Sequence, residues 1–452
     1  MSNSTRFAIV IDVQEFIDRR PLTARHMVIL VLCLLMMVAD GFDTASIGFV
    51  VPALMKEWGV ATKAFGLAVS ASVVGLALGA IISGPIADKL GRKPVLLVSV
   101  AGFGIFSLAA TTSTTLTALA IWRFLTGLGL GAASPNATTL LAEWVPARCR
   151  AFMLNLMYCG FTLGAAAGGF LAGAIIPAYG WKGVFVAGGL TPLIFVLLAI
   201  PFLPESTRFM VAKKWSPERI RHALASVGGV DLAQDYDFRV GSDDSAVRDT
   251  RVWKILFSDA FRSGTIMMWI AFFMGNTIFY MMASWLPTMI RQSGIPLQSA
   301  AVYAALFPLG GAIGGAVCGR LMDRMNPHIS ISGAWTFAGI FIFLLAGFVH
   351  DVNLVPSLTF LAGFMVGAAL ISTPTLAAMF YPTQSRASGV SWMAGVGRLG
   401  GVVGAYLGAL LLGGGLAGAD VVRLLAVPAL AAALAIACKG WLSRGAGVTA
   451  KA

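Results

Sequence analysis

The chain has 452 residues, of which 58% are hydrophobic and only 12% are charged, and its mean hydropathy is +0.84. Soluble domains carry about 25% charged residues, so this composition excludes a soluble protein and indicates a polytopic membrane protein. The net charge of +12 does not indicate a nucleic-acid partner, because the basic residues are spread over short segments between apolar stretches. The positive-inside rule explains them better.

Apolar stretches long enough to span a bilayer recur along the whole chain. The spans that we expect are 27–54, 65–84, 94–113, 116–141, 151–177, 181–203, 263–290, 300–321, 329–350, 354–380, 387–412 and 421–442. The fold class is therefore predicted to be an all-α membrane protein with twelve transmembrane helices in two pseudo-symmetric six-helix bundles. The predicted regions are an N-terminal tail (1–26), a first bundle (27–203), a central loop (204–262), a second bundle (263–442) and a C-terminal tail (443–452). Loop charges place both tails and the central loop in the cytoplasm.

Two aspartates, Asp40 and Asp43, lie inside the first span. A charged side chain near the bilayer centre costs about 2.5–3.5 kcal/mol on the mildest scale. Residues three apart share one helical face, and a low-dielectric site favours the protonated carboxyl. The pair is therefore predicted to carry protons, with a structural bond to neighbouring helices as the alternative.

The two halves of the chain repeat in sequence. Residues 84–89, which include Asp88, recur as 319–324, and residues 146–151 recur as 382–387 at nearly the same offset. Internal repeats are typical of secondary transporters, which bind substrate near the bilayer midplane between the halves. Charges present in both copies are expected to have the same structural role in each half. We expect them to hold helices together on the cytoplasmic side, and we call such contacts latches.

Four charges within the spans have no counterpart in the other half: Asp40, Asp43, Arg123 and Arg398. We therefore expect them to serve a central cavity. An arginine presents a planar fork that matches a carboxylate. Arg123 either binds a substrate carboxylate or pairs with one of the aspartates, and a purely structural ion pair is the remaining alternative.

Several motifs resemble those of a known family. Residues 84–93, 123–131 and 204–208 resemble signatures of the major facilitator superfamily. Within it, residues 40–43 and 380–387 resemble the aromatic acid/proton symporters. The resemblance implies proton-driven uptake of benzoate-like acids, such as 4-hydroxybenzoate or protocatechuate, for aromatic catabolism, across a bacterial inner membrane. A symporter for another organic anion or for a sugar is the alternative.

A benzoate-like substrate needs one cationic anchor and apolar walls. Arg398 is the first choice for the anchor, with Arg123 as the second substrate-binding cation. The remaining candidates for the binding site are Phe42, Tyr158, Phe161, Tyr280 and Trp392 as walls and Asn276 as a partner for a ring hydroxyl. Ordinary packing is the alternative for each aromatic residue.

Further charged residues near the cytoplasmic ends of the spans are predicted to gate the transporter. They are Asp88, Arg92, Lys93, Glu143, Arg150, Asp323, His328 and Arg386. The second loop copy lacks the Gly-Arg-Lys end of the first, so its latch is weaker or uses His328. The alternative is that these charges determine topology alone.

The energy source is predicted to be the proton gradient, with no cofactor. No phosphate-binding G-x-x-x-x-G-K-[ST] motif occurs in the sequence. Neither the five cysteines nor the four histidines have the spacing of a metal site, and the scattered histidines disfavour a membrane enzyme. The expected partners are the small aromatic carboxylate, the proton and the bilayer, and a monomer suffices.

Overall fold

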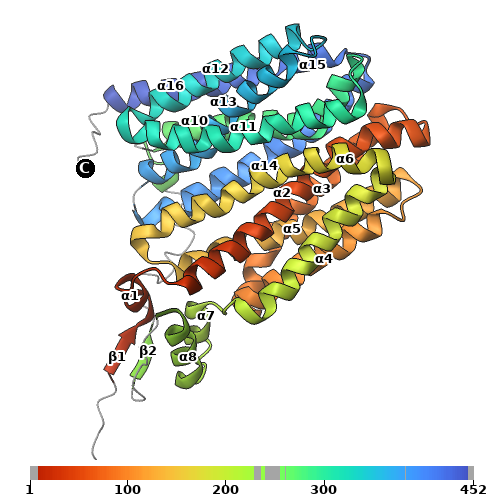
Figure 1. Cartoon of the computed structure of the whole chain (residues 1–452). Coiled ribbons are helices and arrows are strands. Elements are labelled where there is room, and N and C mark those ends of the chain that lie inside the picture. Colours follow the sequence, from red (N-terminus) through yellow and green to blue (C-terminus); the bar gives the residue numbers. More distant parts are fainter. Residues whose placement is uncertain (1–8, 229–235, 240–254, 260, 382, 446–452) are drawn as a thin grey trace, which may run out of the picture.

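The computed structural model describes residues 9–228, 236–239, 255–259, 261–381 and 383–445. Its long helices form two layers, one from each half of the chain (Figure 1). The first half contains α2 (Ala24–Trp58), η1 (Thr62–Ala64), α3 (Phe65–Leu90), α4 (Arg92–Ala110), α5 (Leu116–Trp144) and α6 (Ala147–Phe202). The second contains α10 (Arg262–Gln292), α11 (Leu297–Arg324), α12 (Pro327–Gly347), α13 (Leu354–Phe380), α14 (Thr383–Gly413), α15 (Gly418–Leu424) and α16 (Ala426–Gly445).

In the described part of the chain, eleven helical segments are long and apolar enough to cross a membrane. One of them, α6, has 56 residues, which at 1.5 Å per residue would extend about 84 Å, far beyond a hydrocarbon core of about 30 Å. Its backbone leaves the helical conformation at Gly180, with φ 67° and ψ −175°. The predicted fifth and sixth spans end and begin on either side of this glycine. The reversal therefore divides α6 into two crossings and confirms the predicted twelve-helix fold.

Equivalent helices pack in the same way in both halves. In the first half α2 packs on α6 and α3 packs on α5, and in the second half α10 packs on α14 and α11 packs on α13. Glycines allow this close approach: a Cβ at Gly131 would overlap the Leu76 carbonyl, and a Cβ at Gly363 would overlap that of Phe307. Small residues at helix interfaces are the usual means of packing in membranes.

The two halves contact each other mainly at the end away from the chain termini. There α2 meets α10, α3 meets α14 and α6 meets α11. Gly48 lies against the backbone of α10, Gly66 lies against α14, and Arg291 Nη1 donates to the Pro52 carbonyl at 2.6 Å. Toward the other end, Tyr158 of α6 and Trp392 of α14 are 44% and 42% exposed. We call the end at which these contacts join the halves the closed end, and the opposite end, which carries the chain termini, the accessible end.

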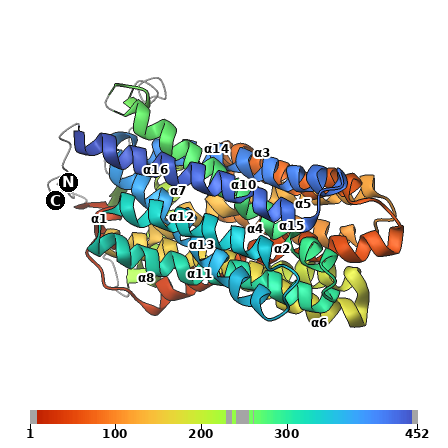
Figure 2. The same cartoon turned by 90° about the horizontal axis from the view of Figure 1, so that it is seen from above.

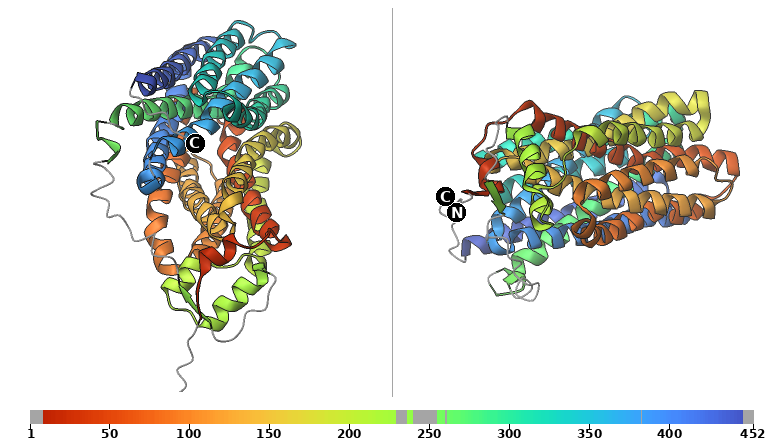
Figure 3. Two further views of the ribbon diagram at one scale, coloured as in Figure 1. Left: turned by 90° about the vertical axis from the view of Figure 1, so that its left-hand side faces the viewer. Right: turned by 90° about the horizontal axis from the view of Figure 1, so that it is seen from below.

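A small subdomain lies at the accessible end. It consists of β1 (Ile9–Asp12), α1 (Val13–Asp18), α7 (Thr207–Ala212), α8 (Pro217–Gly228) and β2 (Tyr236–Arg239). The two strands pair in parallel, with Ile9 opposite Tyr236. Figures 2 and 3 show β1 and the end of α16 at the same end of the bundle. Four-residue strands were not predicted, because such short segments show too little alternation to be recognised beside apolar spans.

Candidate functional site

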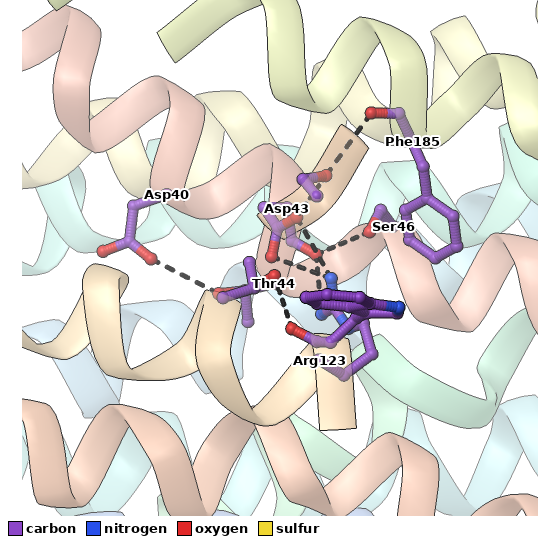
Figure 4. Close-up of polar contacts among 9 residues, drawn as sticks. Asp40, Asp43, Thr44, Ser46, Arg123 and Phe185 are labelled. Atoms are coloured by element: carbon purple, nitrogen blue, oxygen red, sulfur yellow. Dashed lines mark hydrogen bonds and ion pairs between the residues drawn. The ribbon is translucent and has the colours of Figure 1, made fainter. Parts of the chain in front are cut away.

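Asp43 forms a complete ion pair with Arg123 inside the first half. Arg123 Nη1 donates to both carboxylate oxygens of Asp43, at 3.0 and 2.9 Å, and Nη2 donates to the Asp43 carbonyl at 3.2 Å. Ser107 on α4 adds a donor at 3.3 Å. Asp43 and Arg123 both have a relative exposure of 0%. The ring centre of Phe185 of α6 lies 5.7 Å from the Arg123 guanidinium carbon (Figure 4), so the partners named here all belong to the first half.

Asp40 lies one turn earlier on α2 and has different surroundings. In the described part of the chain it accepts one hydrogen bond, from Thr44 Oγ1 at 3.4 Å, which is at the long limit for such a bond. Its carboxylate lies apart from the Asp43–Arg123 pair (Figure 4). It interacts electrostatically with Asp43 and, more weakly, with Arg398 on α14 of the second half. Asp40 is 4% exposed, so it is a buried carboxylate within electrostatic range of the second half.

Two tyrosines complete what we call the central cluster: Asp40, Tyr158, Tyr280 and Arg398. The phenols of Tyr158 on α6 and Tyr280 on α10 each interact electrostatically with both Asp40 and Arg398. Among the described residues, the Arg398 guanidinium has no hydrogen-bond or ion-pair partner. Four helices, two from each half, thus present one carboxylate, one cation and two phenols to the same space.

Aromatic rings cross the boundary beside this cluster. The rings of Phe161 on α6 and Phe279 on α10 lie 6.0 Å apart, and Phe279 also contacts Tyr280 at 5.6 Å and Phe307 at 6.3 Å. Aromatic pairs at this spacing attract each other beyond simple burial. They form an apolar group of rings that adjoins Tyr280 of the central cluster.

The other predicted wall residues lie in different places. Phe42 is buried within the first half, against Gly168 and Gly188 of α6. Asn276 donates to the Phe272 carbonyl at 2.8 Å, and its side chain lies close to Gly397, next to Arg398. Trp392 is partly exposed on α14. Of these three, Asn276 is placed nearest to the central cluster.

The predicted gating residues of the first half contact one another at the accessible end. Asp88 and Arg92 form an ion pair at 2.8 Å. Glu205 Oε1 accepts hydrogen bonds from the backbone N–H groups of Arg92 and Lys93, at 2.9 and 3.1 Å. Glu143 accepts a short hydrogen bond from the Ser206 hydroxyl. These contacts join the α3–α4 turn and the end of α5 to the segment after α6, all within one half.

Further gating candidates contact the ends of other elements. Arg150 pairs with Asp18 of α1 at 3.8 Å. His328 Nε2 lies 2.9 Å from Lys439 Nζ, which connects the start of α12 to α16. Asp323 and Arg386 lie outside the residues whose side chains the structure describes.

Sequence reasoning missed several residues that contribute to these sites. Ser107 and Phe279 lie in apolar spans, where a serine or a phenylalanine has no distinctive pattern. Glu205 belongs to the motif at residues 204–208, and this motif was the sequence signal that could have identified its hydrogen bonds to the start of α4. Lys439 is buried at 3% exposure and its ammonium lies 4.1 Å from the Phe380 ring centre, although its position at the end of an apolar stretch is typical of an interfacial charge.

Comparison with known proteins identifies the family. The Major Facilitator Superfamily model matches residues 33–405. The 4-hydroxybenzoate transporter PcaK of Pseudomonas aeruginosa is 43% identical over 433 residues, which cover 96% of this chain and 96% of that protein. The gallate transporter of Pseudomonas putida is 43% identical over 434 residues, which cover 95% of both. The benzoate transport protein of Acinetobacter baylyi is 31% identical over 89% of this chain and 87% of its own.

Solved structures agree on the fold. The crystal structure of a D-xylose-proton symporter has a TM-score of 0.69 at 16% identity and covers 91% of this chain and 97% of its own. A bacterial homologue of the human lysosomal transporter Spinster has a TM-score of 0.72 at 15% identity and covers 94% of this chain and 98% of its own. The chain therefore is a transporter rather than an enzyme, and it belongs to the aromatic-acid transporters of the major facilitator superfamily.

Proposed function

We propose that this protein imports benzoate-like carboxylates, such as 4-hydroxybenzoate or protocatechuate, together with protons. The observation that carries the proposal is the central cluster, in which Arg398 has no hydrogen-bond partner among the described residues and interacts electrostatically with Asp40 of the other half. A guanidinium in such a position binds a carboxylate with two parallel hydrogen bonds. The aromatic surface of Phe161, Phe279 and Tyr280 provides the apolar wall that a benzene ring requires.

Charge balance in the central cluster explains the coupling. When Asp40 is ionised, it neutralises Arg398, and the empty transporter can change conformation. When Asp40 is protonated, Arg398 keeps an unpaired positive charge, which is costly to enclose. A bound substrate carboxylate restores neutrality, so the protonated protein closes only around its substrate. Proton and carboxylate therefore move together.

Alternating access follows from the two-layer arrangement. In the orientation that the positive-inside rule predicts, the closed end faces the periplasm and the accessible end faces the cytoplasm. The charged residues of the first half contact their own half in this state, as Asp88 and Arg92 do. We propose that they contact the second half when the transporter opens outward, which makes them latches of that state.

The cellular setting belongs to the same proposal. The chain spans the bacterial inner membrane with both termini in the cytoplasm, operates as a monomer without a cofactor, and supplies aromatic catabolism. A monoanion that enters with one proton is electroneutral, so the pH gradient alone drives that stoichiometry. Uptake with a second proton would carry one net positive charge inward. The membrane potential would then add about 2.3 kcal/mol per 100 mV to the driving force for uptake.

Purified protein in liposomes with an imposed pH gradient tests the proposal. The wild type is expected to accumulate labelled 4-hydroxybenzoate only when the outside is more acidic. Asp40→Asn is expected to lose accumulation but to keep exchange of labelled for unlabelled substrate, because its side chain stays neutral. Asp420→Asn, at an exposed pair with Arg423, is the matched control. Gradient-driven accumulation by Asp40→Asn at the wild-type level would refute the role of Asp40.

A further inference from the structure

Three hydroxyl groups meet on the first-half side of the central cluster, and we call them the hydroxyl corner. Ser134 and Thr138 lie one turn apart on α5, and Tyr158 lies on α6. The Tyr158 and Thr138 hydroxyl oxygens are 2.7 Å apart. The Ser134 side chain also lies beside the Tyr158 phenol.

The hydrogen bonds of Thr138 decide which way the Tyr158 proton points. Thr138 Oγ1 donates its one proton to the Ser134 carbonyl at 2.8 Å. It can therefore only accept from Tyr158, since each hydroxyl has a single proton to donate. The Tyr158 proton is directed at Thr138, and the phenol oxygen is left to act as an acceptor.

This acceptor faces the space between the halves. Tyr158 is 44% exposed, and its phenol interacts with Arg398 of the second half as well as with Asp40. In the binding mode that we consider, the carboxylate binds Arg398 and the ring is directed toward the hydroxyl corner. A hydrogen-bond donor on that ring meets an oxygen that can accept it.

We propose, building on the function proposed above, that the hydroxyl corner selects aromatic acids that carry a ring hydroxyl. Tyr158 accepts the proton of the substrate hydroxyl, and Thr138 positions Tyr158 to do so. A site made to bond a hydroxyl discriminates against analogues without one, because its own polar group is then left unpaired. A neutral hydrogen bond corresponds to a preference of about threefold to tenfold. A methyl ether, which has no proton to donate, is disfavoured like plain benzoate.

The test compares three competitors of labelled 4-hydroxybenzoate in exchange assays with proteoliposomes: unlabelled 4-hydroxybenzoate, benzoate and 4-methoxybenzoate. In the wild type, 4-hydroxybenzoate is expected to compete about threefold to tenfold better than the other two. Tyr158→Phe is expected to weaken 4-hydroxybenzoate more than benzoate, so that the preference between the two is lost. Thr138→Val frees the Tyr158 proton, so 4-methoxybenzoate is expected to gain on 4-hydroxybenzoate.

Matched controls are Tyr179→Phe, at an exposed tyrosine of α6, and Thr191→Val, where the threonine donates to the Ala187 carbonyl at 2.8 Å as Thr138 does to Ser134. Both are expected to keep the wild-type preference. If Tyr158→Phe weakens all three competitors equally, or if Thr138→Val leaves the order unchanged, the selection proposal is wrong and the transport proposal stands. If the wild type exchanges none of these acids, the proposed function fails and this inference fails with it.

Discussion

The two aspartates of α2 lie one turn apart and are both buried, at 4% and 0% exposure, yet their partners come from different parts of the molecule. Asp43 takes its cation, Arg123, and its serine donor from the first half. Asp40 takes a single long hydrogen bond from its own helix, and the cation near it, Arg398, belongs to the second half. Both carboxylates lie at a similar depth, so depth does not distinguish them. The difference is which half supplies the cation: we call Asp43, paired within its own half, the fixed charge, and Asp40, whose cation belongs to the other half, the adjustable charge.

The difference has an energetic consequence. A rigid movement of one half against the other leaves the distance between Asp43 and Arg123 unchanged, so that pair stabilises the first half in every conformation. The same movement changes the distance between Asp40 and Arg398. Their interaction is therefore the part of the electrostatic energy that depends on conformation, as a transport cycle requires.

The largest effect is expected when the fixed pair is broken. Arg123→Met leaves the Asp43 carboxylate buried without a counter-charge, which costs about 3–5 kcal/mol. The midpoint of thermal unfolding of the purified protein should fall accordingly. Arg398→Met is the matched substitution at the adjustable pair, and it should change the midpoint less, because among the described residues Asp40 accepts its hydrogen bond from Thr44 and none from Arg398.

A double variant sharpens this prediction. Arg123→Met combined with Asp43→Leu removes both charges and should recover most of the lost stability, since replacement of a buried pair by apolar residues is often neutral. If Arg123→Met alone unfolds at the wild-type temperature, the pair does not hold the first half together and the contrast between the two aspartates loses its basis.

The second effect concerns transport rather than folding. Arg398→Ala removes the proposed carboxylate anchor, and hydrogen bonds to charged groups are worth about 1.5–3 kcal/mol. The KM for 4-hydroxybenzoate uptake should rise about tenfold to a hundredfold, as measured from the concentration dependence of initial rates. Arg423→Ala, at an exposed arginine of α15, should leave KM unchanged. An unchanged KM in Arg398→Ala would mean that another group holds the carboxylate.

The sequence was sufficient for the fold because membranes impose simple rules. Every backbone polar group in hydrocarbon must be bonded within a helix, so apolar length alone predicted twelve spans, including the two that meet at Gly180. The internal repeat then separated the paired charges, such as Asp88, from the unpaired ones. The same reasoning could not decide which aspartate meets Arg123. Positions 40 and 43 differ by only about 60° around a helix, and the rotation of α2 against α5 depends on packing that no sequence pattern encodes.

The smallest expected effect concerns the hydroxyl groups that donate hydrogen bonds to the two carboxylates, Ser107 for Asp43 and Thr44 for Asp40. Ser107→Ala removes a buried donor to Asp43, and one such hydrogen bond contributes about 0.5–1.5 kcal/mol to stability. Thr44→Val removes a donor to Asp40 that lies one turn away on the same helix, so no contact between helices is lost. Thermal unfolding should therefore show a larger loss for Ser107→Ala than for Thr44→Val, while KM is unchanged in the serine variant. The reverse order would indicate that Asp40 is held as firmly as Asp43, and the distinction between a fixed and an adjustable carboxylate would then depend on the arginines alone.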